Sequence, residues 1–153
     1  MQGFPSGQRD TAKDRVLNAS QVRILSSALF DYIGEILKNI NWKNKFKEGK
    51  ELILSTSSLN GKPNVNIVIS LGLIDNKLLI ANCQMQTTIK NLTENKEVAL
   101  LGGYYRINGK AKLYTSGKYF DICVKKSKGY KVKTAILITI KKVTDLDTQK
   151  VLF

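Results

Sequence analysis

The sequence contains no histidine, only two cysteines and no apolar run approaching the roughly 20 residues that a membrane-spanning helix needs. Without histidine, the usual zinc and iron ligand sets and the Ser-His and Cys-His nucleophile pairs cannot be assembled. Cys83 and Cys123 are too far apart in sequence to form a CxxC motif. We therefore expect no metal site and no catalytic side chain of these types. The N-terminus also lacks the apolar region of a secretory signal, so we expect a cytoplasmic protein.

The composition is that of a single globular domain, with 153 residues, 42% hydrophobic and 24% charged. The formal net charge is +13. The segment from Arg106 to Lys142 contains eleven Lys or Arg and one acid, so it contributes 11 − 1 = +10 of this net charge. Such a face attracts a phosphorylated or other anionic ligand, unless it is only a solvated lysine surface. Because lysine dominates and aromatic residues do not alternate with the charges, nucleic acid is a weaker hypothesis.

Residues 1–28 differ from the rest in their basic residues, with three of the four arginines and only one of the 21 lysines. In addition, residues 21–25 (QVRIL) can be back-translated to contain the GTTCGAATC of a transfer-RNA T-arm. Our hypothesis is that this gene start was assigned too early, inside a transfer-RNA gene. The alternative is a flexible N-terminal extension. Either way, we expect residues 29–153 to form the domain.

The hydrophobic pattern predicts a mainly β protein with a few helices. Apolar residues recur at helical spacing from Leu29 to Phe46, so this segment is predicted to be an amphipathic helix with its apolar face toward the core. Strands are predicted at 51–56, 64–70, 78–81, 98–101, 104–115 and 133–142, and a further helix at 117–127. Asn60-Gly61 and Asp75-Asn76 mark turns, and Asn108-Gly109 marks a bulge. About six short strands favour a closed barrel, because closure removes exposed edges.

A short helix is predicted between the third and fourth strands, starting at the polar corner 85–88. Thr87 is a good N-cap there, and the free amides of the first turn would suit a phosphate. Thr88 and Asn91 are three residues apart and share a face of this helix. The alternative is an ordinary capped surface helix whose threonines serve only the cap.

The order of these motifs resembles the FMN-binding split β-barrel family, which includes pyridoxamine 5′-phosphate oxidase. The resemblance covers about residues 37–146 and depends on the order of four segments: 60–65 (NGKPNV), 75–81 (DNKLLIA), 87–100 (TTIKNLTENKEVAL) and 108–111 (NGKA). It implies a six-stranded antiparallel split barrel with an N-terminal helix and a short helix between strands. It also implies a homodimer that holds FMN at or near the interface.

The resemblance further assigns candidate cofactor-binding residues. By position, the flavin phosphate would meet Gln86, Thr87 and Thr88 and, one turn on, Asn91. The flavin ring would lie along Asn66, Ile67 and Val68, partly against their backbone, and Asn82 is a further polar contact. These eight residues are the predicted site.

The sequence also departs from the family. Many relatives carry Arg or Lys at the phosphate, whereas this corner is neutral, which leaves Lys90 or the basic C-terminal third to balance the charge. The oxidase's substrate-gripping histidine and arginine have no evident counterparts. We therefore expect an FMN-dependent oxidoreductase or electron carrier other than the oxidase. The alternatives are a non-catalytic barrel that binds an anionic ligand, and a different cofactor such as another flavin, a deazaflavin or haem.

Overall fold

The computed structural model describes residue 3 and residues 16–153, apart from the side chains of residues 38–40. It divides the chain into two units, Met1–Leu37 and Lys38–Phe153. Helix α1 (Ala19–Lys45) runs across this boundary, and the second unit contains every strand in the described part of the chain. None of the helices in that part is both long and apolar enough to span a bilayer.

Helix α1 begins ten residues before the predicted start at Leu29. The cause is a reciprocal cap: the Asn18 side chain accepts a hydrogen bond from the Gln21 amide at 2.9 Å, while the Gln21 side chain accepts one from the Asn18 amide at 3.0 Å. On the predicted apolar stripe, Leu29, Ile33, Ile36 and Leu37 are not buried within the first unit. Packing of this stripe on a core stays a prediction.

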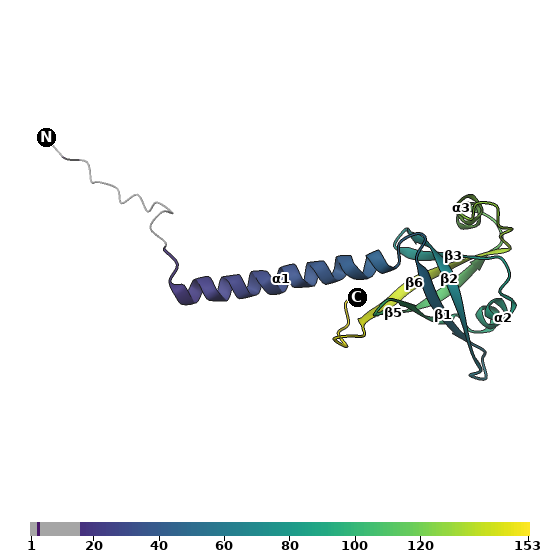
Figure 1. Ribbon diagram of the computed structural model, residues 1–153, viewed down its shortest axis with the longest axis horizontal. Helices are drawn as coiled ribbons and strands as arrows, with labels where there is room; N and C mark the ends of the chain where they lie inside the picture. The colour runs from purple at the N-terminus through teal and green to yellow at the C-terminus, as the bar shows by residue number, and fades with distance from the viewer. Residues whose placement is uncertain (1–2, 4–15) are drawn as a thin grey trace. The chain divides into compact units, whose positions relative to one another are not determined.

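The second unit is a closed antiparallel barrel, which confirms the predicted fold class (Figure 1). Its strands are β1 (Glu51–Ser57), β2 (Pro63–Ile74), β3 (Lys77–Asn82), β4 (Glu97–Gly102), β5 (Tyr105–Tyr114) and β6 (Thr134–Asp145). They follow one another around the barrel in the order β1-β2-β3-β6-β5-β4. Helix α2 (Gln86–Glu94) contacts β1, β2 and β5, whereas helix α3 (Lys118–Lys126) contacts β3 and β6.

The predicted turns and bulge lie where the sequence placed them. Asp75 and Asn76 both have positive φ, which suits the tight turn between β2 and β3. The register of β5 against β6 shifts between Asn108 and Gly109. A Cβ at Gly109 would lie 2.5 Å from the carbonyl oxygen of Thr139, so only glycine fits at this bulge.

Two apolar clusters hold the barrel together. The larger fills its interior and includes Trp42, in the last turn of α1, and Phe46, directly after the helix; their rings meet edge to face with centroids 6.1 Å apart. The smaller lies between α3 and the outer side of β3 and β6, and includes the buried residues Leu79, Cys123 and Leu137. Helix α3 is therefore held mainly by apolar contact.

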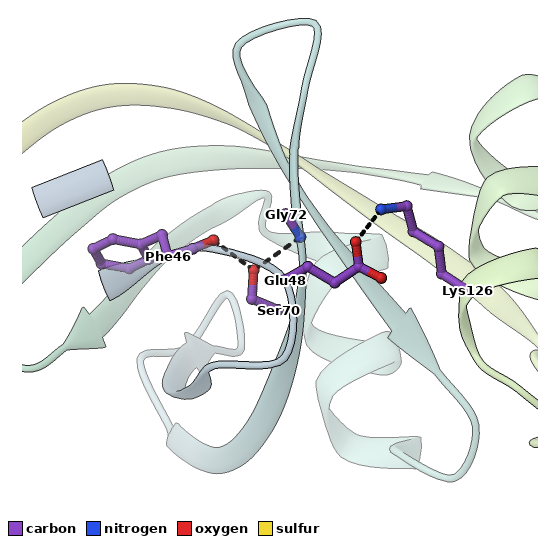
Figure 2. Close-up of polar contacts among 5 residues, drawn as sticks. All are labelled: Phe46, Glu48, Ser70, Gly72 and Lys126. Carbon is purple, nitrogen blue, oxygen red and sulfur yellow. Dashed lines mark hydrogen bonds and ion pairs between the residues drawn. The ribbon is translucent and has the colours of Figure 1, made fainter. Parts of the chain in front are cut away.

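A polar link joins the segment before β1 to β2 and to α3 (Figure 2). The buried Ser70 hydroxyl donates a hydrogen bond to the Phe46 carbonyl oxygen at 2.7 Å and accepts one from the Gly72 amide at 3.0 Å. Next to it, Glu48 pairs with Lys126 in the last turn of α3. The start of β1 and the end of α3 are thereby tied to the same point of the barrel.

Candidate functional site

Helix α2 starts without a side-chain cap. Its N-cap is Met85, with an extended backbone, so the predicted N-cap at Thr87 was wrong. The turn closes earlier because the Asn82 side-chain oxygen accepts a hydrogen bond from the Met85 amide at 2.7 Å. Thr87 consequently lies exposed in the first turn, beside the exposed Gln86. First-turn amides have no partner within a helix, so this turn offers donors to an anion.

Below this turn, a buried polar network fixes α2 to the barrel. The Thr88 hydroxyl is fully buried and accepts hydrogen bonds from the side-chain amides of Asn66 and, at 3.1 Å, Asn64. The Asn91 amide donates to the Thr56 hydroxyl at 3.1 Å, and the Asn64 amide lies 3.3 Å from that hydroxyl. We refer to these five residues as the carboxamide network.

The network determines which face of α2 remains accessible. Thr88, Asn91 and, just past the helix, Asn95 lie on one stripe, and the Asn95 amide continues the contact by donating to the Ser57 hydroxyl at 3.0 Å. Hydrogen bonds are directional, so this stripe sets the rotation of the helix as well as its position. The opposite side, with Thr87 and Lys90, stays exposed.

A groove of about 600 Å³ lies between the exposed side of α2 and the turn that joins β1 to β2. Its volume falls within the usual range for small-molecule sites. Lys62 and Lys90 line it together with Thr87 and Asn91, and Glu94 is the one acid among its lining residues. The groove is therefore net positive next to the first turn of α2. The remaining lining residues are Ser58, Leu59, Asn60 and Pro63.

The structure brings part of the predicted site together. Asn66, Thr88 and Asn91 belong to the carboxamide network, Thr87 and Asn91 line the groove, and Gln86 is next to Thr87. Because the Thr88 hydroxyl is buried, it holds α2 in place and does not face the groove.

The other predicted residues lie apart from the groove lining. Asn82 is buried and shapes the turn before α2. Ile67 and Val68 point to opposite sides of β2: Val68 is in the barrel core, whereas Ile67 is 74% exposed on the outer side. Contact with one ligand surface would therefore involve the side chain of Ile67 but only the backbone of Val68.

Sequence reasoning missed Thr56, Asn64 and Lys62. The signal was present in the hairpin, because the turn around Asn60-Gly61 sets Ser57 opposite Pro63 and Thr56 opposite Asn64. Lys62 in this turn, together with Lys90, supplies the positive charge that the neutral corner lacks. Of the two sources of charge considered from the sequence, it is Lys90 that lines the groove, since no residue of the C-terminal third is among the lining residues.

An exposed apolar strip covers the outer side of β1 and β2. Ile53 lies opposite Ile67 in the register, and Val65 and Ile69 flank Ile67 on the same side of β2. All four are more than 40% exposed in the single chain, at 43% for Ile53, 74% for Ile67, 59% for Val65 and 47% for Ile69. A contiguous apolar strip of this kind marks an interaction surface.

Cys123 is buried and is not suited to act as a nucleophile. Burial, and to a smaller extent the nearby Cys83, raises the pKa of the Cys123 thiol to about 12. Because the thiolate is the reactive form, Cys123 acts as a packed core residue.

With the fold and the corner defined, the chain can be placed in a family. The model of the pyridoxamine 5′-phosphate oxidase family matches residues 42–147, which include the whole barrel and α2. The chain belongs to this family.

Individual relatives agree with this placement. An uncharacterized protein of Methanocaldococcus jannaschii is 30% identical over 128 residues, which is 75% of this chain and 86% of the relative. The crystal structure of HupZ from Group A Streptococcus superposes with a TM-score of 0.57 at 25% identity, covering 65% of this chain and 86% of that one. An FMN-binding protein from Syntrophomonas wolfei has the same fold, with a TM-score of 0.58 at 18% identity over 78% of this chain and 95% of that one.

Proposed function

We propose that this protein binds FMN, with the flavin phosphate at the first turn of α2, and acts as an oxidoreductase or electron carrier. The observation that carries the proposal is the convergence of Lys62, Lys90 and Thr87 on one groove beside uncapped helix amides. Family membership and the FMN-binding protein among the structural neighbours support it.

The donor set suits a phosphate. The first-turn amides and the Thr87 hydroxyl are hydrogen-bond donors, and the positive end of the helix dipole favours an anion. Two lysine ammonium groups oppose the single carboxylate of Glu94 in the lining, which leaves a net positive charge for the ligand. The carboxamide network keeps these groups in place, because α2 cannot rotate without breaking several buried or part-buried hydrogen bonds.

The outer side of β2 suits the remaining, apolar part of the cofactor. Ile67 is the most exposed residue of the apolar strip, two residues from Val65 and Ile69 on the same side. We propose that a second copy of the chain covers this strip in a homodimer, with the cofactor at its edge. An Ile67→Lys variant is then expected to sediment as a monomer, whereas a wild-type protein that is itself monomeric would contradict the dimer.

FMN, when bound, supplies hydride or electron transfer at its N5 atom. The protein's own contribution would be to hold the phosphate through Lys62, Lys90 and Thr87, and to exclude water from the ring by means of the apolar strip. No acid or base of the protein is required, in agreement with the absence of histidine.

A fluorescence titration of the purified protein with FMN tests the assignment. Loss of a charge-assisted hydrogen bond costs roughly 1.5 kcal/mol of binding free energy. Lys62→Gln and Lys90→Gln are therefore each expected to weaken FMN binding about tenfold. Lys96→Gln is the matched control, since Lys96 is exposed, lies two residues past α2 and is outside the groove lining. Equal affinities for all of these variants would contradict the phosphate site.

The non-catalytic alternative predicts a different result in the same titration. A barrel that serves only to bind an anionic ligand would show little affinity for FMN, while inorganic phosphate would still bind with the same dependence on Lys62 and Lys90. That outcome would keep the groove as an anion site and remove the flavin from it.

A further inference from the structure

A second positive surface lies at the end of α3, separate from the groove. We define the basic segment as residues 125–133 (KKSKGYKVK), which hold five lysines and no acid. Lys125, Lys128, Lys131 and Lys133 are exposed, and of the five only Lys126 pairs with an acid among the described residues, namely Glu48. The groove lining includes no residue of this segment.

The shape of the segment is fixed. The Tyr130 amide donates a hydrogen bond to the Ser127 carbonyl oxygen at 3.1 Å, and Lys128 and Gly129 between them have positive φ. Where the segment enters β6, the Lys133 amide donates to the Asn82 carbonyl oxygen at 2.8 Å. The side chain of the same Asn82 shapes the turn before α2, so the end of the segment lies next to that turn.

Part of this charge has a structural explanation, but part does not. Lys125 and Lys126 lie in the last turn of α3, where cations stabilise the helix dipole. Lys128, Lys131 and Lys133 lie beyond the helix, and none of them pairs with a described acid. Three like charges within six residues repel one another, which costs stability unless an opposite charge is bound.

We propose that the basic segment is a docking surface for an acidic protein. Charge complementarity favours an anionic partner, and it argues against a second copy of this chain, whose net charge is also +13. Val124 and Tyr130, which are 50% and 73% exposed, provide an apolar contact in and beside the segment, as at the centre of a protein interface.

Two other polyanions fit the surface less well. Nucleic-acid sites combine a basic groove with a series of stacking aromatics or with arginine forks, whereas the segment has one aromatic residue and no arginine. Membrane association through a basic cluster is strengthened by a broad apolar face, and here the exposed apolar residues are Val124 and Tyr130.

The test uses the full-length protein and a fluorescent poly-glutamate peptide of about 30 residues as an acidic-chain probe. We expect wild-type binding to weaken steeply as salt is raised from 50 to 200 mM, and the Lys128→Glu/Lys131→Glu double variant to lose at least about tenfold in affinity. The control is Lys141→Glu/Lys142→Glu, which makes the same change in net charge. These lysines are exposed eight or nine residues past the segment's end, near the far end of β6, at about 3.3 Å per residue.

Each outcome decides the proposal. The proposal is supported if only the Lys128→Glu/Lys131→Glu variant loses affinity for poly-glutamate. The wild type must also bind poly-glutamate more tightly than it binds a 20-nucleotide single-stranded RNA or vesicles with phosphatidylserine. Equal loss in both double variants would show only non-specific attraction and would overturn it. Tighter, segment-dependent binding of the RNA or of the vesicles would overturn it in favour of that partner. FMN titration of the same variants reports separately on the groove.

Discussion

The two short helices of the barrel, α2 and α3, are each nine residues long and each lack a side-chain N-cap, yet only α2 adds a network of side-chain hydrogen bonds to its apolar contacts. Helix α2 buries Leu92 in the barrel core and is also held by hydrogen bonds that Thr88 accepts and Asn91 donates. Helix α3 is held by an apolar cluster around Cys123 and by exposed ion pairs. Apolar contacts tolerate small shifts, but hydrogen bonds require defined angles. The attachment that fixes orientation therefore occurs at the helix beside the groove.

The largest expected effect on stability belongs to the α3 side. Leu137 is 2% exposed in the cluster below α3, so Leu137→Ala should lower the free energy of unfolding by about 3 kcal/mol. Urea denaturation measures this, and Val124→Ala on the exposed side of α3 is the control, expected within about 0.5 kcal/mol. If α2 alone orients the groove, the FMN affinity of the folded Leu137→Ala protein is unchanged.

The next effect falls on the α2 side. Thr88→Val keeps the shape of the side chain but removes the acceptor of the Asn66 amide and leaves the Asn64 amide only the Thr56 hydroxyl, which should cost about 2 kcal/mol. Unlike Leu137→Ala, it should also weaken FMN binding, because α2 loses part of its fixed orientation. Thr93→Val is the matched control in the same helix, since the Thr93 hydroxyl is exposed and bonds only the Ile89 carbonyl oxygen. A larger effect on FMN binding from Leu137→Ala than from Thr88→Val would reverse the comparison.

The smallest effect concerns pH at the start of α3. The Lys118 ammonium and then the Tyr119 hydroxyl donate hydrogen bonds to Asp75, and both lower its pKa below the ordinary value of 3.8. A lowered pKa in the folded state adds stability above pH 3.8, and this contribution disappears as the pH falls through the folded-state pKa. The stability difference between wild type and Asp75→Asn should therefore be small at pH 6 and vanish at lower pH. A difference that grows on acidification would contradict this pairing.

Much of the barrel could be predicted from the sequence, because each strand has its own alternation and each turn its own signal. The Asn60-Gly61 and Asp75-Asn76 turns and the bulge at Gly109 are local features of this kind. The start of α1 was missed because the cap at Asn18 lies in a segment interpreted as an extension. For the rest of α1, periodicity reveals an apolar stripe but not what covers it.

The candidate site was harder to predict for a physical reason. The start of α2 depends on a hydrogen bond from the Met85 amide to Asn82, which competes with the equally plausible cap at Thr87. The carboxamide network depends on the register between β1 and β2, and Lys62 reaches the groove only because the hairpin folds over α2. Sequence proximity therefore identified the corner, while the residues from other strands required the structure.

The most direct test of the phosphate site compares FMN with riboflavin, which lacks only the phosphate, in wild type and in Thr87→Asp. Thr87 is exposed in the first turn of α2, where an added carboxylate is compatible with the helix dipole but repels a phosphate. We predict that wild type binds FMN at least about tenfold more tightly than riboflavin, and that Thr87→Asp removes this preference while riboflavin affinity stays the same. Equal affinity of the wild type for both flavins, or an undiminished preference in the variant, would contradict a phosphate site at the start of α2.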